Sequence, residues 1–311
     1  MRDYFINKLL LLYLVLFSPV VLATPDQQLT VIDVSDTVKS IVGPITNRTT
    51  KNLGNNATFG VVITQQGVIL IDSGGSYKGA EAIHTLIKAM TDQPVKFVIN
   101  TGGQDHRWFG NSYFRKLGAK IISSKAAKLD HQTRESSQLG MLSSLIGDDA
   151  IKGTQPEVAD ILFDEEYTLK LGDRVLEIHH KGQAHTPGDA FVWLAKEKIM
   201  FTGDIVYLDR MLGVGAQSHS GEWIKTFEAM AKYKPEIIIP GHGKPATLKE
   251  ATQFTYDYLM FLRTEVSKLL DDDKDMLAIK EIDQGKYKDL KNFEVISGRN
   301  AQKVFSEMEF E

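Results

Sequence analysis

The sequence predicts an α/β fold, and three observations lead to that prediction. Short β-rich runs alternate with helical runs from Val38 onward. Two of the β-rich runs, 59–63 and 68–72, are separated only by a polar turn and therefore predict a hairpin. Polar loops that contain glycine follow directly after several apolar strands, which is where α/β proteins commonly carry their functional residues.

The first half of the chain continues from this hairpin through helices and strands in alternation. The second hairpin strand ends abruptly at Asp72-Ser-Gly-Gly75, and apolar residues then recur at helical spacing. The elements expected here are a helix around 82–90, a buried strand at 95–99, a polar loop at 100–111, a short helix near 113–114, a strand at 120–122 and a long helix from 125 to about 145.

The second half begins with strands alone. A helix with Ser220 as its N-cap follows them, because a serine hydroxyl can accept from the free N–H groups of a first turn. The elements expected are strands at 167–171, 175–179, 191–194 and 199–201, a helix at 222–233, a strand at 236–239, a helix from 247 to about 271 and a polar helical tail.

Composition excludes several classes of protein. The 311 residues carry 36 Lys+Arg and 40 Asp+Glu without runs of one sign. We therefore do not expect nucleic acid as a partner, and we expect a small-molecule substrate. There is no cysteine, which excludes disulfides, iron–sulfur clusters, thiolate zinc sites and cysteine nucleophiles. Any metal ion must therefore be held by His, Asp or Glu.

The N-terminus has the pattern of a secretory signal peptide. Arg2 and Lys8 precede an apolar run at 9–17, and small residues follow as far as Ala23. The apolar run is too short to span a bilayer comfortably, which disfavours the alternative of a permanent anchor. We predict cleavage after Ala23 and a periplasmic or secreted protein without a stable membrane anchor.

Four loops share one property: each follows an apolar strand, contains glycine and carries a His or an Asp. They are 102–107, 182–189, 201–204 and 239–243. Any one of these residues alone is more commonly a turn or cap residue, but four such loops indicate one site. Imidazole and carboxylate groups on rigid strand ends are the ligands that a zinc-type ion needs.

The motifs His185-Thr-Pro-Gly-Asp189, Phe201-Thr-Gly-Asp204, Pro240-Gly-His242-Gly and Ile71-Asp72-Ser-Gly, in their order and spacing, resemble the metallo-β-lactamase superfamily, which includes glyoxalase II and many zinc hydrolases. The resemblance covers roughly residues 35–262. It implies a four-layer αββα sandwich of two mixed β-sheets with a metal site at one edge between the sheets.

The resemblance also suggests how the chain is divided. We expect a signal peptide at 1–23, an αββα domain at 24–262 and a C-terminal helical extension at 263–311. The many charged residues of the extension indicate a solvated surface helix or a contact between two copies of the chain.

The roles that the resemblance implies begin with Asp72, which matches a structural aspartate that braces the metal loop. His185 matches the histidine of the first metal position. Asp204 matches the carboxylate that bridges two metals or serves one, and His242 matches the histidine of the second position.

The family's H-x-H-x-D-H loop is degenerate in this chain. An alignment without gaps places its four ligand positions on Gly102, Gln104, His106 and Arg107. A shift of one residue instead matches Asp105-His106 to the family's Asp-His pair, but it needs two compensating gaps. His106 is a candidate ligand in both alignments, and Asp105 is one in the second.

The two missing histidines have a chemical consequence. The first position keeps only His185 and a share of Asp204, which are too few ligands to hold an ion firmly. The second keeps His106, with or without Asp105, together with Asp204 and His242. We therefore expect one ion in the second position, zinc first, with iron or manganese as alternatives. Asp204 or Asp105 would accept the proton of a water molecule, and His185 would steady the substrate or a developing oxyanion.

Other residues are expected to contact the substrate. The backbone N–H groups of Gly102 and Gly103 could serve as donors, because no side chain intervenes there. Arg107 and Trp108 suit an anionic, partly apolar substrate, although loop packing is their ordinary alternative. The residues expected to line the cleft after Asp204 are Tyr207, Arg210 and His219.

The leading interpretation is an exported metal-dependent hydrolase of a small ester, thioester or related compound. The loop from Gly102 to Trp108 is similar to that of periplasmic members that accompany sulfur-oxidation or quinoprotein systems. The alternative is a non-catalytic periplasmic binding or accessory protein on the same fold. A β-lactamase is less favoured, since the missing histidines belong to the more widely used metal position.

Overall fold

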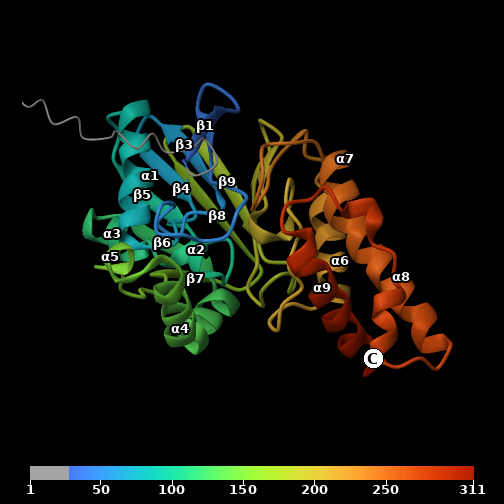
Figure 1. Ribbon diagram of the computed structural model, residues 1–311. Coiled ribbons are helices and arrows are strands. Elements are labelled where there is room, and N and C mark those ends of the chain that lie inside the picture. The colour runs from blue at the N-terminus through green and yellow to red at the C-terminus, as the bar shows by residue number, and fades with distance from the viewer. Residues whose placement is uncertain (1–27) are drawn as a thin grey trace, which may run out of the picture.

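The computed structural model describes residues 28–311, which form two β-sheets packed between layers of helices (Figure 1). The predicted signal peptide, residues 1–23, lies outside the described residues. Within residues 28–311, every helix falls short of the length and apolar character that a membrane crossing needs.

The first sheet contains seven strands in the order β1 to β7. Its first four strands are antiparallel, and β5, β6 and β7 add to β4 in parallel, so the sheet is mixed. The predicted hairpin is confirmed as β3 and β4. The strands are β1 (Thr30–Asp33), β2 (Val38–Val42), β3 (Thr58–Thr64), β4 (Gly67–Ile71), β5 (Val95–Ile99), β6 (Lys120–Ser124) and β7 (Ile161–Phe163).

The second sheet contains five strands in the order β12-β11-β10-β9-β8. Only β11 and β12 are parallel to each other, so this sheet is mixed as well. The strands are β8 (Glu166–Leu171), β9 (Arg174–His179), β10 (Phe191–Leu194), β11 (Ile199–Phe201) and β12 (Ile237–Ile239).

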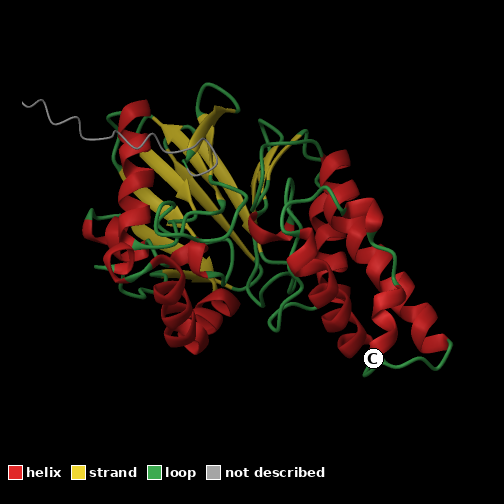
Figure 2. Ribbon diagram, viewed as in Figure 1, coloured by secondary structure: helices red, strands yellow, loops and turns green. Residues whose placement is uncertain are grey.

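The helices lie on the two outer sides of the paired sheets, as Figure 2 shows, which gives four layers. Those of the first half are α1 (Tyr77–Met90), α2 (Asp105–Trp108), α3 (Asn111–Lys116), α4 (Lys125–Ile146) and α5 (Asp148–Ile151). Those of the second half are η2 (Gly203–Ile205), α6 (Ser220–Ala231), α7 (Leu248–Ala251), the π-helical turn η3 (Thr252–Tyr256), α8 (Asp257–Asp271), η4 (Met276–Glu281), η5 (Gly285–Tyr287) and α9 (Phe293–Met308).

Apolar clusters fill the spaces between these layers. One lies between the sheets and joins Val62 and Ile99 of the first sheet to Ile178 and Phe201 of the second. The sheets approach so closely that a Cβ atom at Gly60 would lie 2.2 Å from the ring of Phe201, so only glycine fits there. A second cluster joins α1 to the first sheet, and a third joins α6, α8 and α9 to the second.

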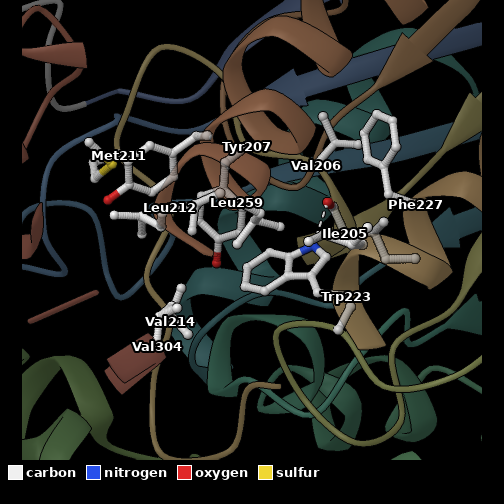
Figure 3. Close-up of a cluster of buried hydrophobic side chains, with 14 of the residues drawn as sticks. Ile205, Val206, Tyr207, Met211, Leu212, Val214, Trp223, Phe227, Leu259 and Val304 are labelled. Carbon is white, nitrogen blue, oxygen red and sulfur yellow. Dashed lines mark hydrogen bonds between the residues drawn. The ribbon is translucent and has the colours of Figure 1, made fainter. Parts of the chain in front are cut away.

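The third cluster also fixes the loop that follows β11. Figure 3 shows Trp223 of α6 among the side chains of this loop, with its indole Nε1 donating to the carbonyl of Ile205 at 2.9 Å. Val206, Tyr207 and Met211 of the loop are buried in the same cluster. The loop after Asp204 is therefore part of the core.

The N-cap expected for α6 is off by one residue. His219, rather than Ser220, caps the helix, and its ring nitrogen Nδ1 accepts from the backbone N–H of Glu222. Ser220 is the first helical residue, and its hydroxyl donates instead to Glu307 of α9. The prediction missed this because imidazole is an uncommon capping acceptor.

The interpretation of the C-terminal extension as a solvated helix is wrong. The proposed boundary at residue 262 falls inside α8, and α9 packs on α8 with Val304 and Phe305 buried. Asn300 donates to the carbonyl of Leu212 at 2.8 Å and accepts from the N–H of Val214 at 2.7 Å. The sequence pattern did not predict this burial, because the apolar face of α9 is narrow and the segment around it is rich in charged residues.

We predict that Phe305→Ala lowers the free energy of unfolding by about 3–5 kcal/mol, because it empties a fully packed site in the third cluster. Gln302→Ala, on the exposed face of the same helix, should change it by less than about 0.5 kcal/mol. Denaturant unfolding of both variants measures the difference. Equal, small effects would contradict the close packing of Phe305 in the third cluster.

Candidate metal centre

The two sheets meet at one edge, where the candidate loops converge. The N–H of Thr58 at the start of β3 donates to the carbonyl of Gly241, and its hydroxyl donates to that of Gly243 at 2.6 Å. Because β11 and β12 are parallel neighbours, Asp204 and His242 leave the sheet at the same edge. The short helix α2 brings His106 there from the end of β5.

Three predicted ligands meet at this edge: His106, Asp204 and His242. Nε2 of His106 lies 3.2 Å from one carboxylate oxygen of Asp204, and Nε2 of His242 lies 3.2 Å from the other. One ligand atom from each residue lies within 4.8 Å of the other two, and all three residues are buried. Two imidazoles and one carboxylate form the donor set of a catalytic zinc site.

The neighbours of His242 prepare it as a ligand. Its Nδ1 lies 2.8 Å from the carbonyl of Asn56, which can only accept, so the ring proton sits on Nδ1 and the lone pair on Nε2. The ring stacks on Tyr207 with centroids 4.6 Å apart. Burial and then the charge of Arg210 lower the pKa of His242 well below its ordinary value, so the imidazole is neutral.

Arg107 is structural, and the expectation that it contacts substrate is wrong. It is fully buried, and all five of its N–H groups are used. Two of them donate to Asp204, one at 2.6 Å and one at 3.1 Å, and another donates to Asp72 at 2.8 Å. The other two donate to the carbonyls of Thr58 and Gly241.

The two aspartates that Arg107 joins have pKa values that are shifted in opposite directions. Burial alone would raise the pKa of Asp204, but Arg107 and then His106 bring it well below its ordinary value. Burial of Asp72 raises its pKa despite the same arginine. Asp72 also accepts from the N–H and hydroxyl of Thr101, so it braces the loop before α2, as the resemblance implies.

Trp108 is buried as well, and its predicted role in substrate binding is wrong. Its indole donates to Gln138 at 3.2 Å, and its ring stacks on His131 with centroids 4.2 Å apart. Both partners belong to α4. One helical turn sends consecutive side chains of α2 in different directions, so His106 faces the site while Trp108 faces α4.

Gly102 and Gly103 do not form the expected pair of backbone donors. The N–H of Gly103 already donates to the hydroxyl of Thr186 at 2.9 Å. The carbonyl of Gly103 accepts from Arg134 and Gln138 of α4, and the carbonyl of Gly102 is paired with a ring nitrogen of His131. Side chains of α4 thus hold the loop at Gly102 and Gly103 in place through hydrogen bonds.

The carboxyl group of Asp189 takes up the space beside Gly102. A Cβ atom at Gly102 would lie 2.3 Å from a carboxyl oxygen of Asp189. Asp189 accepts from the N–H of Thr186 at 2.8 Å and from its hydroxyl. Burial and then the charge of Asp204 raise the pKa of Asp189 to about 8. No side chain at residue 102 could reach a metal without displacing this carboxyl group.

His185 remains beside the site without joining the three ligands. Its Nδ1 lies 2.9 Å from the carbonyl of Gly213, which leaves the lone pair on Nε2. Burial lowers its pKa to about 4, against the opposing effect of Asp204. His185 is therefore neutral at physiological pH.

Asp105 is not one of the three ligands. Its carboxylate accepts from Arg48 at 2.5 Å and from the backbone N–H of His106 at 2.7 Å. Burial would raise its pKa, but the charge of Arg48 and the contacts with His106 lower it below its ordinary value. Of the two residues that the alignments left open, His106 lies in the cluster with Asp204 and His242, and Asp105 lies beside His106 outside that cluster.

His219, which was expected to line the cleft, belongs to a polar cluster outside the three residues at the sheet edge. It lies 3.0 Å from Glu307, and together with Glu311 these groups are close enough to suggest a second cation site. Arg263, however, pairs with both glutamates. The cluster is a network of ion pairs and hydrogen bonds that joins α9 to α8 and to the start of α6.

Sequence reasoning missed the importance of two arginines near the ligands. Arg48 comes from the loop between β2 and β3, where no pattern distinguished it. Arg210 was expected only to line the cleft. It is buried, its Nε has no partner, and its one hydrogen bond goes to the carbonyl of Thr46. Within residues 28–311, Arg210 forms no ion pair with a carboxylate.

Comparison with known proteins agrees with this architecture. A sequence model described as the metallo-β-lactamase superfamily matches residues 53–242. The chain belongs to the metallo-β-lactamase superfamily. The predicted fold of two mixed sheets between helical layers is thereby confirmed.

Individual members of the metallo-β-lactamase superfamily are distant from this chain. The metallo-β-lactamase type 2 of Elizabethkingia meningoseptica is 25% identical over 191 residues, which cover 60% of this chain and 68% of the relative. A solved metallo-β-lactamase from Pontibacter korlensis is similar with a TM-score of 0.60 and 22% identity, covering 75% of this chain and 99% of that one. The DIM-1 metallo-β-lactamase gives a TM-score of 0.57 at 20% identity, covering 75% and 97%.

We predict that Asp189→Asn flattens the pH dependence of stability in this metallo-β-lactamase relative. The pKa of Asp189 is about 8 in the folded chain against an ordinary 3.8, so the folded state binds the extra proton between these values. Its contribution to stability is therefore complete below about pH 4 and is lost as the pH rises through about 8.

Urea unfolding at several pH values measures this effect. The wild type should lose more stability between pH 5 and 8 than the variant does, because an amide does not titrate. Parallel curves for the two proteins would show that Asp189 is ionised throughout. Asp173→Asn, which changes an exposed carboxylate, is the control.

Proposed function

We propose that this protein is a metal-dependent hydrolase that holds one zinc ion between His106, Asp204 and His242. The observation that supports it best is the geometry of these ligands, with both Nε2 atoms 3.2 Å from one carboxylate. The carbonyl of Asn56 holds His242 in the tautomer that a metal ligand needs. Iron and manganese are the alternative ions.

A zinc ion held there would supply the Lewis acidity that activates water and polarises an ester or thioester oxygen. The residues around it divide the remaining work. Asp204 holds charge rather than protons, because Arg107 occupies both of its oxygens and keeps its pKa low. Asp105 is held in the same way by Arg48. Neither is a good proton acceptor.

Of the three residues expected to be catalytic, Asp204, Asp105 and His185, only His185 has a free lone pair, although it was expected to steady the substrate and not to accept a proton. Its Nδ1 is fixed by Gly213 and its Nε2 has no partner among the described residues. Because its pKa is about 4, the neutral form that can accept a proton or hydrogen-bond a substrate predominates at neutral pH. We assign His185 to proton transfer or substrate contact.

Arg210 supports an anionic substrate. It is a buried cation without a carboxylate partner among the described residues. Burial lowers its pKa against the opposing effect of Tyr207, and the like charge of Arg48 adds to the lowering. An unpaired buried charge is costly unless a ligand pairs with it. We infer that the substrate carries a carboxylate or phosphate group, so that the anionic preference first given to Arg107 belongs to Arg210.

The proposal includes export. The predicted signal peptide would place the mature enzyme in the periplasm or outside the cell, where it would act on a small molecule. N-terminal sequencing of the protein recovered from its native host checks the predicted cleavage after Ala23.

We predict that the purified wild type binds one equivalent of zinc and that His106→Ala and His242→Ala each bind far less. His185→Ala should keep the ion, because His185 is outside the three ligands. Elemental analysis after dialysis against zinc measures the stoichiometry. A wild type that binds no zinc would favour the non-catalytic accessory protein, and two equivalents would contradict a single site.

Activity is measured on a panel of anionic esters, thioesters and β-lactams. We predict that Arg210→Met raises KM for an anionic substrate by about 10- to 100-fold with a smaller change in kcat, because a charge-assisted contact is lost. The neutral methyl ester of the same compound is the control and should show little change. An equal loss on both compounds would exclude recognition of the anion by Arg210.

A further inference from the structure

The two histidine ligands differ at the ring nitrogen that faces away from Asp204. His242 has a carbonyl oxygen there, which can only accept. His106 instead has two neighbours at Nδ1: the guanidinium of Arg48 at 3.3 Å and the carboxylate of Asp105 at 3.4 Å. One of these groups can only donate a hydrogen bond, and the other, when ionised, can only accept one.

The two neighbours favour opposite tautomers of His106. If Arg48 donates to Nδ1, the ring proton must sit on Nε2, where it points at Asp204, 3.2 Å away. That tautomer has no lone pair at Nε2 and cannot bind a metal through it. If the proton sits on Nδ1, Asp105 is the acceptor within reach and Nε2 is free to bind.

We propose that Asp105 is a positioning residue that acts through His106 by accepting the proton of Nδ1, and that Arg48 opposes metal binding by donating to the same nitrogen. This inference rests on the proposed metal site. Binding of an ion through Nε2 would require the tautomer with the proton on Nδ1. The change from the other tautomer would release one proton from Nε2 to solvent and take one up from solvent at Nδ1. Arg48 loses its contact with Nδ1 and keeps its ion pair with Asp105.

The proposal explains why the arginine and the aspartate are held together. The loop between β2 and β3 carries Arg48, whose side chain is 14% exposed, and Asp105 is 2% exposed. Nε of Arg48 is buried without a partner, so the pair is incompletely satisfied. Arg48 could pair with Asp105 without touching His106, and its additional contact with Nδ1 is what connects the pair to the metal site.

The two halves of the pair should therefore shift zinc affinity in opposite directions. We predict that Asp105→Asn weakens it by about 10- to 100-fold, the usual effect of losing a partner behind a ligand. Arg48→Met should tighten it by about three- to tenfold, because the donor that favours the non-binding tautomer and a nearby positive charge are both removed. Competition with a chromophoric chelator measures both constants.

Glu197→Gln is the control, because it removes the carboxylate of another Arg–carboxylate ion pair, Arg174–Glu197, whose side chains are 16% and 18% exposed and which belongs to the second sheet and its β10–β11 turn. It should leave the zinc affinity unchanged. Thermal unfolding without zinc identifies any variant that has lost its fold. As a second measurement, nitrogen-15 NMR of the zinc-loaded wild type should show a slowly exchanging Nδ1–H on His106, and Asp105→Asn should speed its exchange.

The outcomes separate this inference from the function on which it rests. A wild type that binds no zinc overturns the metal site and this proposal together. A wild type that binds one equivalent while both variants weaken it equally, or neither changes it, leaves the site in place and overturns the roles of Asp105 and Arg48. A proton found on Nε2 of His106 in the loaded protein overturns them too.

Discussion

The guanidinium of Arg107 is the interaction on which the rest of the site depends. It lies where the two sheets meet and joins Asp72 of the first sheet to Asp204 of the second. Its remaining bonds reach the start of β3 and the loop after β12. A buried charge without partners would cost several kcal/mol, so the four segments are held in one arrangement by the need to satisfy one side chain.

This arrangement also determines what each carboxylate can do. Asp204 lies between the guanidinium of Arg107 and the proposed position of the metal ion. The charge of Arg107 keeps its pKa low, so Asp204 remains ionised. Asp189, a short way along the same edge, has no cation paired with it and holds its proton up to about pH 8. Two aspartates of one site thus differ in charge because only one of them reaches an arginine.

The sequence predicted the strands and the hairpin, and it selected three residues that the structure brings together, His106, Asp204 and His242, because these depend on short-range patterns and motif spacing. Arg107 and Trp108 were misassigned because their directions depend on a single helical turn that the pattern could not reveal. Arg48 meets Asp105 across 57 residues of chain, and Asn300 meets Val214 across 86. Such contacts form only when the layers pack together, so local sequence patterns cannot predict them.

The carboxyl group of Asp189 beside Gly102 restricts how this site could change. Restoring a histidine at residue 102 would drive its Cβ into that carboxyl group, only 2.3 Å away. The carboxyl group of Asp189 would have to move or be replaced, and its hydrogen bonds with Thr186 would then be broken. The packing that fixes this loop therefore also restricts which residues position 102 can accept, and a change there is coupled to changes at Asp189 and Thr186.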